Sequence, residues 1–164
     1  MIRYHNITKD DMLNGDGLRT VLWTAGCEHH CPGCQNPVTW DINGGLEFDE
    51  AAKDELFGYL KKPYISGITL SGGDPLLKCR RDEMTELVKE IRQRFPDKTI
   101  WMYTGYKWND VKSLPVIKML DVLVDGRFVQ EKKDTTLSWR GSTNQHVIDV
   151  QRSLALGKMV LHCE

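Results

Sequence analysis

Three closely spaced cysteines are the residues of this chain best suited to chemistry. They are Cys27, Cys31 and Cys34, in the spacing C-x3-C-x2-C, and no fourth cysteine follows nearby. Three thiolates can ligate three irons of a cubane iron–sulfur cluster, whereas an ordinary electron-transfer cluster is ligated by four. A cluster held in this way keeps one iron open, and an open coordination position on a metal is where a substrate binds. The spacing therefore favours cluster chemistry on a bound ligand over simple electron transfer.

The same cysteines are also compatible with a structural zinc site. His29 or His30 would then be the fourth ligand, because three cysteines and one histidine are a common zinc ligand set. Such a chain would be a zinc-stabilised binding module without activity. The spacing lacks the paired C-x2-C knuckles of zinc ribbons, which counts against zinc. In the iron–sulfur interpretation, both histidines are expected to be solvated neighbours of the cluster.

Length and composition predict a single domain over residues 1–164, because 164 residues are enough to bury one core. Charge is nearly balanced, with 22 Lys and Arg against 23 Asp and Glu, and so gives no reason to expect nucleic acid or an anionic membrane as partner. Five cysteines, three of them clustered, do not resemble a secreted disulfide framework. The N-terminal residues lack the apolar segment of a secretory signal. We therefore expect a cytoplasmic protein.

The apolar pattern alternates between strand and helix. Asp49 is a suitable N-cap for a helix that ends near Leu60, and a second amphipathic helix is predicted over 81–95. Predicted strands are 20–24, 65–70, 99–103 and 122–124, with weaker candidates at 146–150 and 158–162. Strands separated by helical stretches predict a parallel sheet built of βα units.

The residues with chemical potential follow the C-terminal ends of four predicted strands. The cysteines follow the strand 20–24, and Ser71-Gly72-Gly73-Asp74 follows the strand 65–70. Thr104 follows the strand 99–103, and Asp125 follows the strand 122–124. In parallel α/β folds that edge of the sheet is where ligands bind. A complete (β/α)8 barrel needs about 250 residues. We therefore predict an incomplete, open-sided (β/α) barrel of parallel strands, shorter than a full TIM barrel.

These motifs together carry a family resemblance. The cysteine spacing resembles the cluster motif of the radical S-adenosylmethionine enzymes, and Gly72-Gly73-Asp74-Pro75 resembles their Gly-Gly-Glu-Pro motif with Asp in place of Glu. The run 15–21 is similar to glycyl-radical-enzyme activases. The segments 121–126 and 139–145 resemble the small activating proteins of anaerobic ribonucleoside-triphosphate reductases. Many members carry an aromatic residue just before the third cysteine. Here that residue is Gly33, so adenine contacts would come from the backbone or from elsewhere.

The resemblance implies a [4Fe–4S] cluster with Cys27, Cys31 and Cys34 as its ligands, and S-adenosylmethionine as the second cofactor. Reductive cleavage would give methionine and a 5′-deoxyadenosyl radical, which would abstract hydrogen from a glycine of the reductase. The implied partners are that reductase and an electron donor such as a flavodoxin-type reductant. The residues expected to bind the cofactors are Gly33, Cys34, Gln35, Ser71, Gly72, Gly73, Asp74, Thr104 and Asp125.

Each part of the glycine motif has an expected role. Glycine allows the backbone to approach a ligand closely, so the carbonyls of Gly72 and Gly73 could accept from the methionine ammonium. Asp74 would anchor the turn or bind that ammonium. No residue is expected to act as a general acid or base, because the radical abstracts hydrogen directly. The alternative within the superfamily is a radical enzyme acting on a small molecule, similar to the deazapurine-forming synthases.

Overall fold

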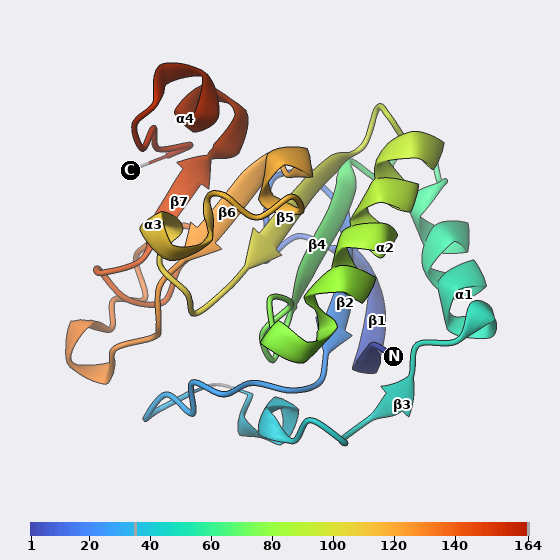
Figure 1. Cartoon of the computed structure of the whole chain (residues 1–164), viewed down its shortest axis with the longest axis horizontal. Coiled ribbons are helices and arrows are strands. Elements are labelled where there is room, and N and C mark those ends of the chain that lie inside the picture. The colour runs from blue at the N-terminus through green and yellow to red at the C-terminus, as the bar shows by residue number, and fades with distance from the viewer. Residues whose placement is uncertain (35, 164) are drawn as a thin grey trace.

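A mixed β-sheet is the scaffold in the computed structural model, which describes residues 1–34 and 36–163 (Figure 1). Among these residues its seven strands are β1 (Arg3–Asp11), β2 (Arg19–Thr24), β3 (Leu46–Glu47), β4 (Gly67–Gly72), β5 (Thr99–Tyr103), β6 (Val122–Asp125) and β7 (His146–Asp149). The α-helices of the same residues are α1 (Glu50–Leu60), α2 (Arg81–Arg94), α3 (Trp108–Val111) and α4 (Val150–Leu156). Short 3₁₀ helices are η1 (Pro37–Trp40), η2 (Lys78–Arg80), η3 (Ile117–Met119) and η4 (Gln130–Lys132).

The strand order is β3-β1-β2-β4-β5-β6-β7. The neighbours β2, β4, β5 and β6 run parallel, as the alternating pattern predicts. The outer strands are antiparallel to their neighbours: β1 and β3 at one edge, and β7 at the other. The sequence predicts neither β1 nor β3. The described sheet is open and mixed, and the incomplete barrel of parallel strands stays a prediction.

The predicted helix boundaries agree with the structure to within a residue. The Asp49 side chain accepts a hydrogen bond from the amide of Ala52 at 2.9 Å and so caps α1. Helix α2 ends at Arg94, two residues before Pro96, which cannot continue a helix. Of the two weaker strand candidates, 146–150 forms β7, whereas 158–162 contributes only an isolated bridge to Ile148.

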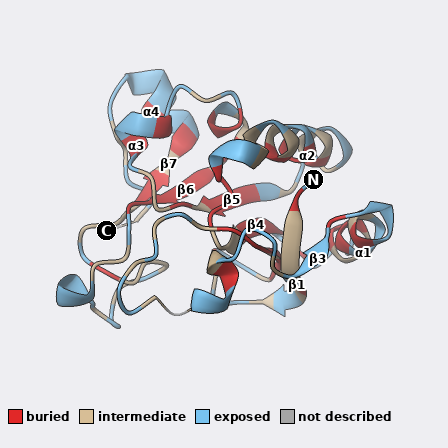
Figure 2. Cartoon of the chain, turned by 60° about the horizontal axis from the view of Figure 1, so that its bottom comes forward, coloured by how far each residue is buried: buried red, intermediate tan, exposed pale blue. Residues whose placement is uncertain are grey.

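The two faces of the sheet are covered differently (Figure 2). Helices α1 and α2 pack on one face, where their apolar residues bury side chains of β4 and β5 such as Leu70 and Met102. The opposite face holds a smaller cluster made of Trp101, Val122, Val124 and Val147. This split follows from the alternation of side chains along each strand. None of the described helices has the length and apolar character needed to cross a membrane.

A buried arginine fixes the N-terminal ends of three parallel strands. Arg19 at the start of β2 is fully buried, and its guanidinium donates to the Thr69 and Thr99 hydroxyls. It also donates to the carbonyls of Asp16, Ile68 and Thr99. Burial lowers the pKa of Arg19 to about 10, so the group stays protonated at neutral pH. Within the run 15–21, Arg19 therefore has a structural role, at the edge of the sheet opposite the cysteines.

We predict that Arg19→Met destabilises the protein strongly. The substitution leaves buried carbonyls and hydroxyls without their donor, and we expect the free energy of unfolding to fall by about 3 kcal/mol or more. Urea unfolding measures this loss. The matched control is Arg152→Met on α4, where the side chain is exposed and no such loss is expected. Equal stability of the two variants would contradict the role assigned to Arg19.

Candidate functional site

The cysteines lie on a loop that leaves the C-terminal end of β2. The loop is tied to the segment that follows it, because the amide of Gly26 donates to the Thr39 carbonyl at 2.7 Å and the amide of Cys27 to that of Trp40 at 3.2 Å. Within the loop, the amide of Cys34 donates to the Cys31 carbonyl at 3.0 Å. The loop is thus folded back on itself, with its three thiols on one short stretch of chain.

The glycine turn after β4 packs directly under this loop. The amide of Gly73 donates to the Thr24 carbonyl, and the amide of Asp74 to that of Gly26, both at 2.8 Å. A Cβ atom on Gly73 would lie 2.5 Å from the Gly26 carbonyl oxygen and 2.8 Å from that of Thr39. Gly72 has a φ of +100°, which favours glycine. In this structure, the glycine pair approaches the backbone that flanks the three cysteines closely.

Asp74 joins three strand ends. Its buried carboxylate accepts from the Thr104 hydroxyl at 2.8 Å and from the amide of Gly105 at 2.9 Å, both beyond β5. It also accepts from the amide of Leu76 and lies 2.6 Å from Nε2 of His29 on the cysteine loop. The side chain therefore anchors the turn, which is one of the two roles that the sequence allows. Thr104 contributes to the site by holding Asp74.

His29 is the residue that sequence reasoning misses. The expectation of a solvated histidine is wrong, because the His29 side chain is only 4% exposed. Its Nδ1 accepts from Nε of Arg127 at 3.0 Å, which leaves Nε2 as the donor to Asp74. The sequence position of His29 beside the cysteines gives no signal for this bridge. His30 is exposed as expected, and its ring stacks on Trp40 at 4.6 Å.

Asp125 is buried at the end of β6 and bonds to two neighbouring elements. One oxygen accepts from the amide of Trp108 at 2.9 Å, and the other accepts from the amide of His146 and contacts its Nδ1 at 2.9 Å. Asp125 does not contact Asp74. The residues around Asp74 and those around Asp125 share one groove of about 770 Å³, which is lined by His29, Gly105 and Asp125.

The remaining predicted residues lie on the same edge. The carbonyl of Ser71 accepts from the Thr24 hydroxyl at 2.9 Å and so links β4 to β2. Gly33 has a φ of +77° and lies under the side chain of Gln130. Gln35 lies outside the described residues.

The three cysteines of the loop supply the ligand type that an iron–sulfur cluster uses. All five cysteines are free thiols, and three of them share the loop after β2. Within residues 1–34 and 36–163, no three His, Cys, Asp or Glu side chains are gathered closely enough to hold a metal ion. Burial raises the pKa of the Cys27 and Cys31 thiols, while Arg127 acts to lower that of Cys31. Ligation by these three cysteines stays a prediction that the thiol chemistry supports.

Comparison with known proteins identifies relatives over most of the chain. A family model described as a 4Fe-4S single cluster domain matches residues 13–148. An anaerobic ribonucleoside-triphosphate reductase-activating protein of Enterobacteria phage T4 is 43% identical, over 89% of this chain and 93% of that protein. The protein of the same name from Escherichia coli (strain K12) is 43% identical, over 89% and 97%. That from Vibrio cholerae is 38% identical, over 88% and 96%. The family match favours iron–sulfur over zinc.

We predict that Cys27→Ser, Cys31→Ser and Cys34→Ser each abolish cluster assembly, because each removes one of three thiolate ligands. Iron and sulfide content after anaerobic reconstitution measures this. Cys79→Ser and Cys163→Ser are the controls, since both residues lie away from the loop in sequence, and they should retain the cluster. If either control loses iron as completely as Cys31→Ser, the cluster has a fourth protein ligand.

We predict that Gly73→Ala lowers cluster content. The added methyl group would overlap two backbone carbonyls of the cysteine segment, which must then shift. Gly58→Ala is the matched control, because nothing lies within 4 Å of a Cβ atom at that position in α1. That control should keep its iron and gain about 0.5–1 kcal/mol of stability. Equal iron content in the two variants would show that the loop tolerates the shift.

Proposed function

This chain belongs to the 4Fe-4S single cluster domain family and, within it, to the anaerobic ribonucleoside-triphosphate reductase-activating proteins, and we propose that it activates such a reductase by generating a glycyl radical. The observation that carries the proposal is the identity of about 43% with activating proteins over nearly their whole length. The three thiols on the loop after β2 are consistent with it. The thiols lie at the C-terminal edge of the parallel strands, and ligands bind at that edge in such folds.

The proposed cofactors are a [4Fe–4S] cluster and S-adenosylmethionine. Cys27, Cys31 and Cys34 would ligate three irons and leave the fourth open to the second cofactor. When bound, the cluster supplies the electron that cleaves S-adenosylmethionine to methionine and a 5′-deoxyadenosyl radical. That electron comes from a donor protein of the flavodoxin type. The proposed radical reaction requires an anaerobic, reducing compartment, which we propose is the cytoplasm.

The chain's own residues would position these groups. The carbonyls of Gly72 and Gly73 are the proposed acceptors for the methionine ammonium. Asp74 already accepts from Thr104, Gly105 and His29, so its main contribution is to hold the turn, the cysteine loop and the end of β5 in register. A fixed edge matters because catalysis depends on holding reacting atoms in one geometry. No side chain is required to move a proton in this scheme.

A polypeptide is the substrate that this scaffold suits best. The described strands form a sheet that is open at both edges, so the chain has little structure of its own to enclose a small molecule. A docked protein surface would exclude water from the site and prevent side reactions of the radical. The hydrogen abstracted would come from a glycine α-carbon of the reductase.

The test is to incubate the reconstituted protein with reductant, S-adenosylmethionine and the reductase without oxygen. We expect a glycyl doublet in the electron spin resonance spectrum of the reductase. Omitting the reductase should leave S-adenosylmethionine cleavage slow or uncoupled. Cys31→Ser is the control, and it should give no doublet.

One result would contradict the proposal. Rapid turnover of a nucleobase-like small molecule, with no radical on the reductase and no association with it, would assign the chain to a radical enzyme of another substrate class.

A further inference from the structure

A groove in two adjoining parts leads away from the cysteine loop along the β5–β6 side of the molecule. Its first part, of about 770 Å³, begins at His29 and runs past the end of β6. Its second part, of about 500 Å³, lies between α3, η3 and α4. The two parts share Trp108, Asn109 and Met159 as lining residues, so they form one surface. We call this surface the basic groove, for the charges described next.

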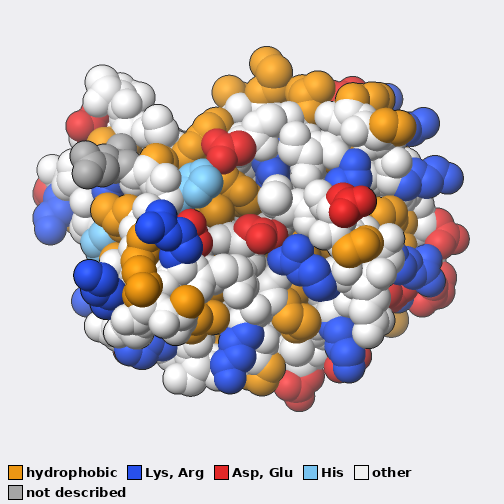
Figure 3. All heavy atoms as spheres, turned by 90° about the horizontal axis from the view of Figure 1, so that it is seen from above, with side chains coloured by type: hydrophobic (Ala, Val, Ile, Leu, Met, Phe, Trp, Pro, Cys, Tyr) orange, Lys and Arg blue, Asp and Glu red, His pale blue; other side chains and the backbone are white. Residues whose placement is uncertain are grey.

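Six exposed basic side chains line the basic groove: Lys107, Lys112, Lys118, Arg127, Lys132 and Lys158. Only two carboxylates line it with them, Asp110 and Asp125, and Asp125 is buried and contacts His146. Among the residues that the structure describes, the ion pairs within 4.0 Å include none of these six cations. The space-filling view shows basic side chains at the left and lower left, the side on which α3 and α4 lie in Figure 1, and others at the centre and right, where acidic side chains lie beside them (Figure 3).

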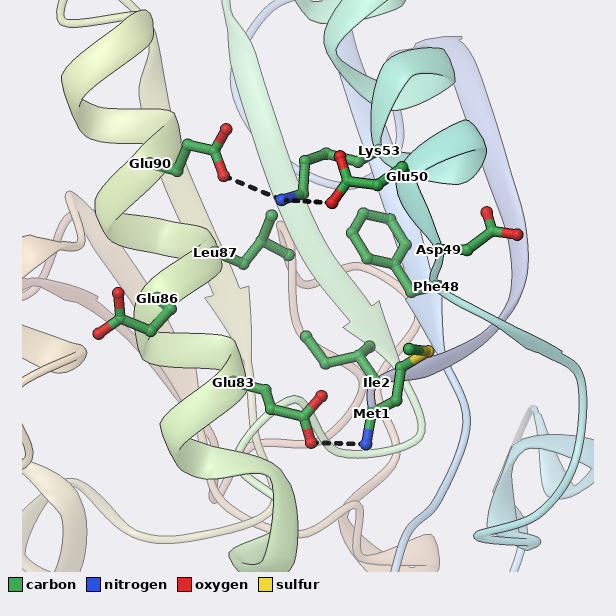
Figure 4. A pocket seen from close by; sticks show the side chains of 10 residues that line it. All are labelled: Met1, Ile2, Phe48, Asp49, Glu50, Lys53, Glu83, Glu86, Leu87 and Glu90. Atoms are coloured by element: carbon green, nitrogen blue, oxygen red, sulfur yellow. Dashed lines mark hydrogen bonds and ion pairs between the residues drawn. The ribbon is translucent and has the colours of Figure 1, made fainter.

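The acidic groove between α1 and α2 shows the opposite arrangement (Figure 4). Its cations are paired inside the groove: Nζ of Lys53 lies 3.0 Å from Glu90 and 3.5 Å from Glu50. The N-terminal ammonium lies 2.7 Å from Glu83. The cations at α1 and α2 are thus each paired with a carboxylate, whereas among the described residues those of the basic groove are not. Concentrated charge of one sign steers and orients a partner of the other sign.

We propose that the basic groove docks an acidic, extended segment of the reductase. The reductase bound in this way would present its glycine to the cysteine loop. The proposal rests on the proposed function. A groove with two connected parts fits a length of polypeptide, whereas a small anion would need only one of them. Its first part is lined by His29, next to the cysteine loop, and so a segment bound there lies beside the reaction site.

A second copy of this chain fits the groove less well. Its acidic groove between α1 and α2 would be the complementary surface, and that surface differs from the basic groove. Such a head-to-tail contact cannot form a two-fold symmetric dimer and would give a ring or an open chain of molecules. The electron donor is the other protein partner. A brief electron-transfer contact needs only a small surface, whereas a substrate protein must stay docked through the reaction.

Charge reversal tests the proposal on the reconstituted protein. One variant carries Lys107→Glu and Lys132→Glu, and the other carries Lys112→Glu and Lys158→Glu. The control carries Lys61→Glu and Lys62→Glu, two exposed cations beyond the C-terminal end of α1, with the same change in net charge. Fluorescence anisotropy of labelled reductase gives the Kd at increasing NaCl. Iron content and thermal melting of each variant report on folding.

We expect each groove variant to bind the reductase about tenfold more weakly than the control, with a shallower dependence on salt. At saturating reductase, with a chemical reductant, the glycyl doublet should return to the wild-type yield, because docking is altered and the chemistry is not. Wild-type affinity in both groove variants would overturn the inference even while the radical forms. So would slower reduction by a flavodoxin-type donor with unchanged reductase binding, which would assign the groove to the donor. Absence of the radical in the wild type would instead refute the proposed function.

Discussion

The buried carboxylate of Asp74 is the constraint on which the C-terminal edge of the sheet depends. A carboxylate away from water is costly unless hydrogen bonds compensate it. Its donors come from the β4 turn, the residues after β5 and His29 of the cysteine loop. Satisfying this one charge therefore brings three separate segments together. Because the strands are parallel, one edge of the sheet holds the thiols, the glycine turn and Thr104. Asp74 fixes how far apart these groups lie.

Arg19 provides the corresponding constraint at the other end of the same strands. Strands β2, β4 and β5 are mostly buried, and apolar packing alone specifies register weakly where both faces are covered. The guanidinium of Arg19 bonds to Thr69 and Thr99, one on each of the next two strands, so a slip of either strand would leave buried polar groups unpaired. One polar tie at each end thus holds an otherwise apolar core in the register that the site requires.

The sequence predicts those parts of the molecule that depend on local pattern. The parallel strands, α1 with its Asp49 cap and α2 follow from apolar periodicity and capping chemistry. Strand β1 is missed because Arg3–Asp11 is rich in polar and charged residues, since much of it faces solvent at the antiparallel side of the sheet. The burial of His29 is missed for a different reason. Its partners Asp74 and Arg127 are distant in sequence, and no local pattern encodes such contacts.

The same long-range contacts connect the basic groove to the cysteine loop. Arg127 lines the groove and donates to His29, which in turn meets Asp74. Gln130, at the start of η4, packs on Gly33 between the second and third cysteines, and Lys132 at the end of η4 is one of the groove's exposed cations. A polypeptide bound to the groove would therefore contact the residues that hold the cysteine loop in place. Because interfaces and packed contacts resist continuous deformation, docking in the groove would favour one arrangement of that loop. Under the proposed docking, partner recognition and the geometry of the cysteine loop would depend on one contiguous set of contacts.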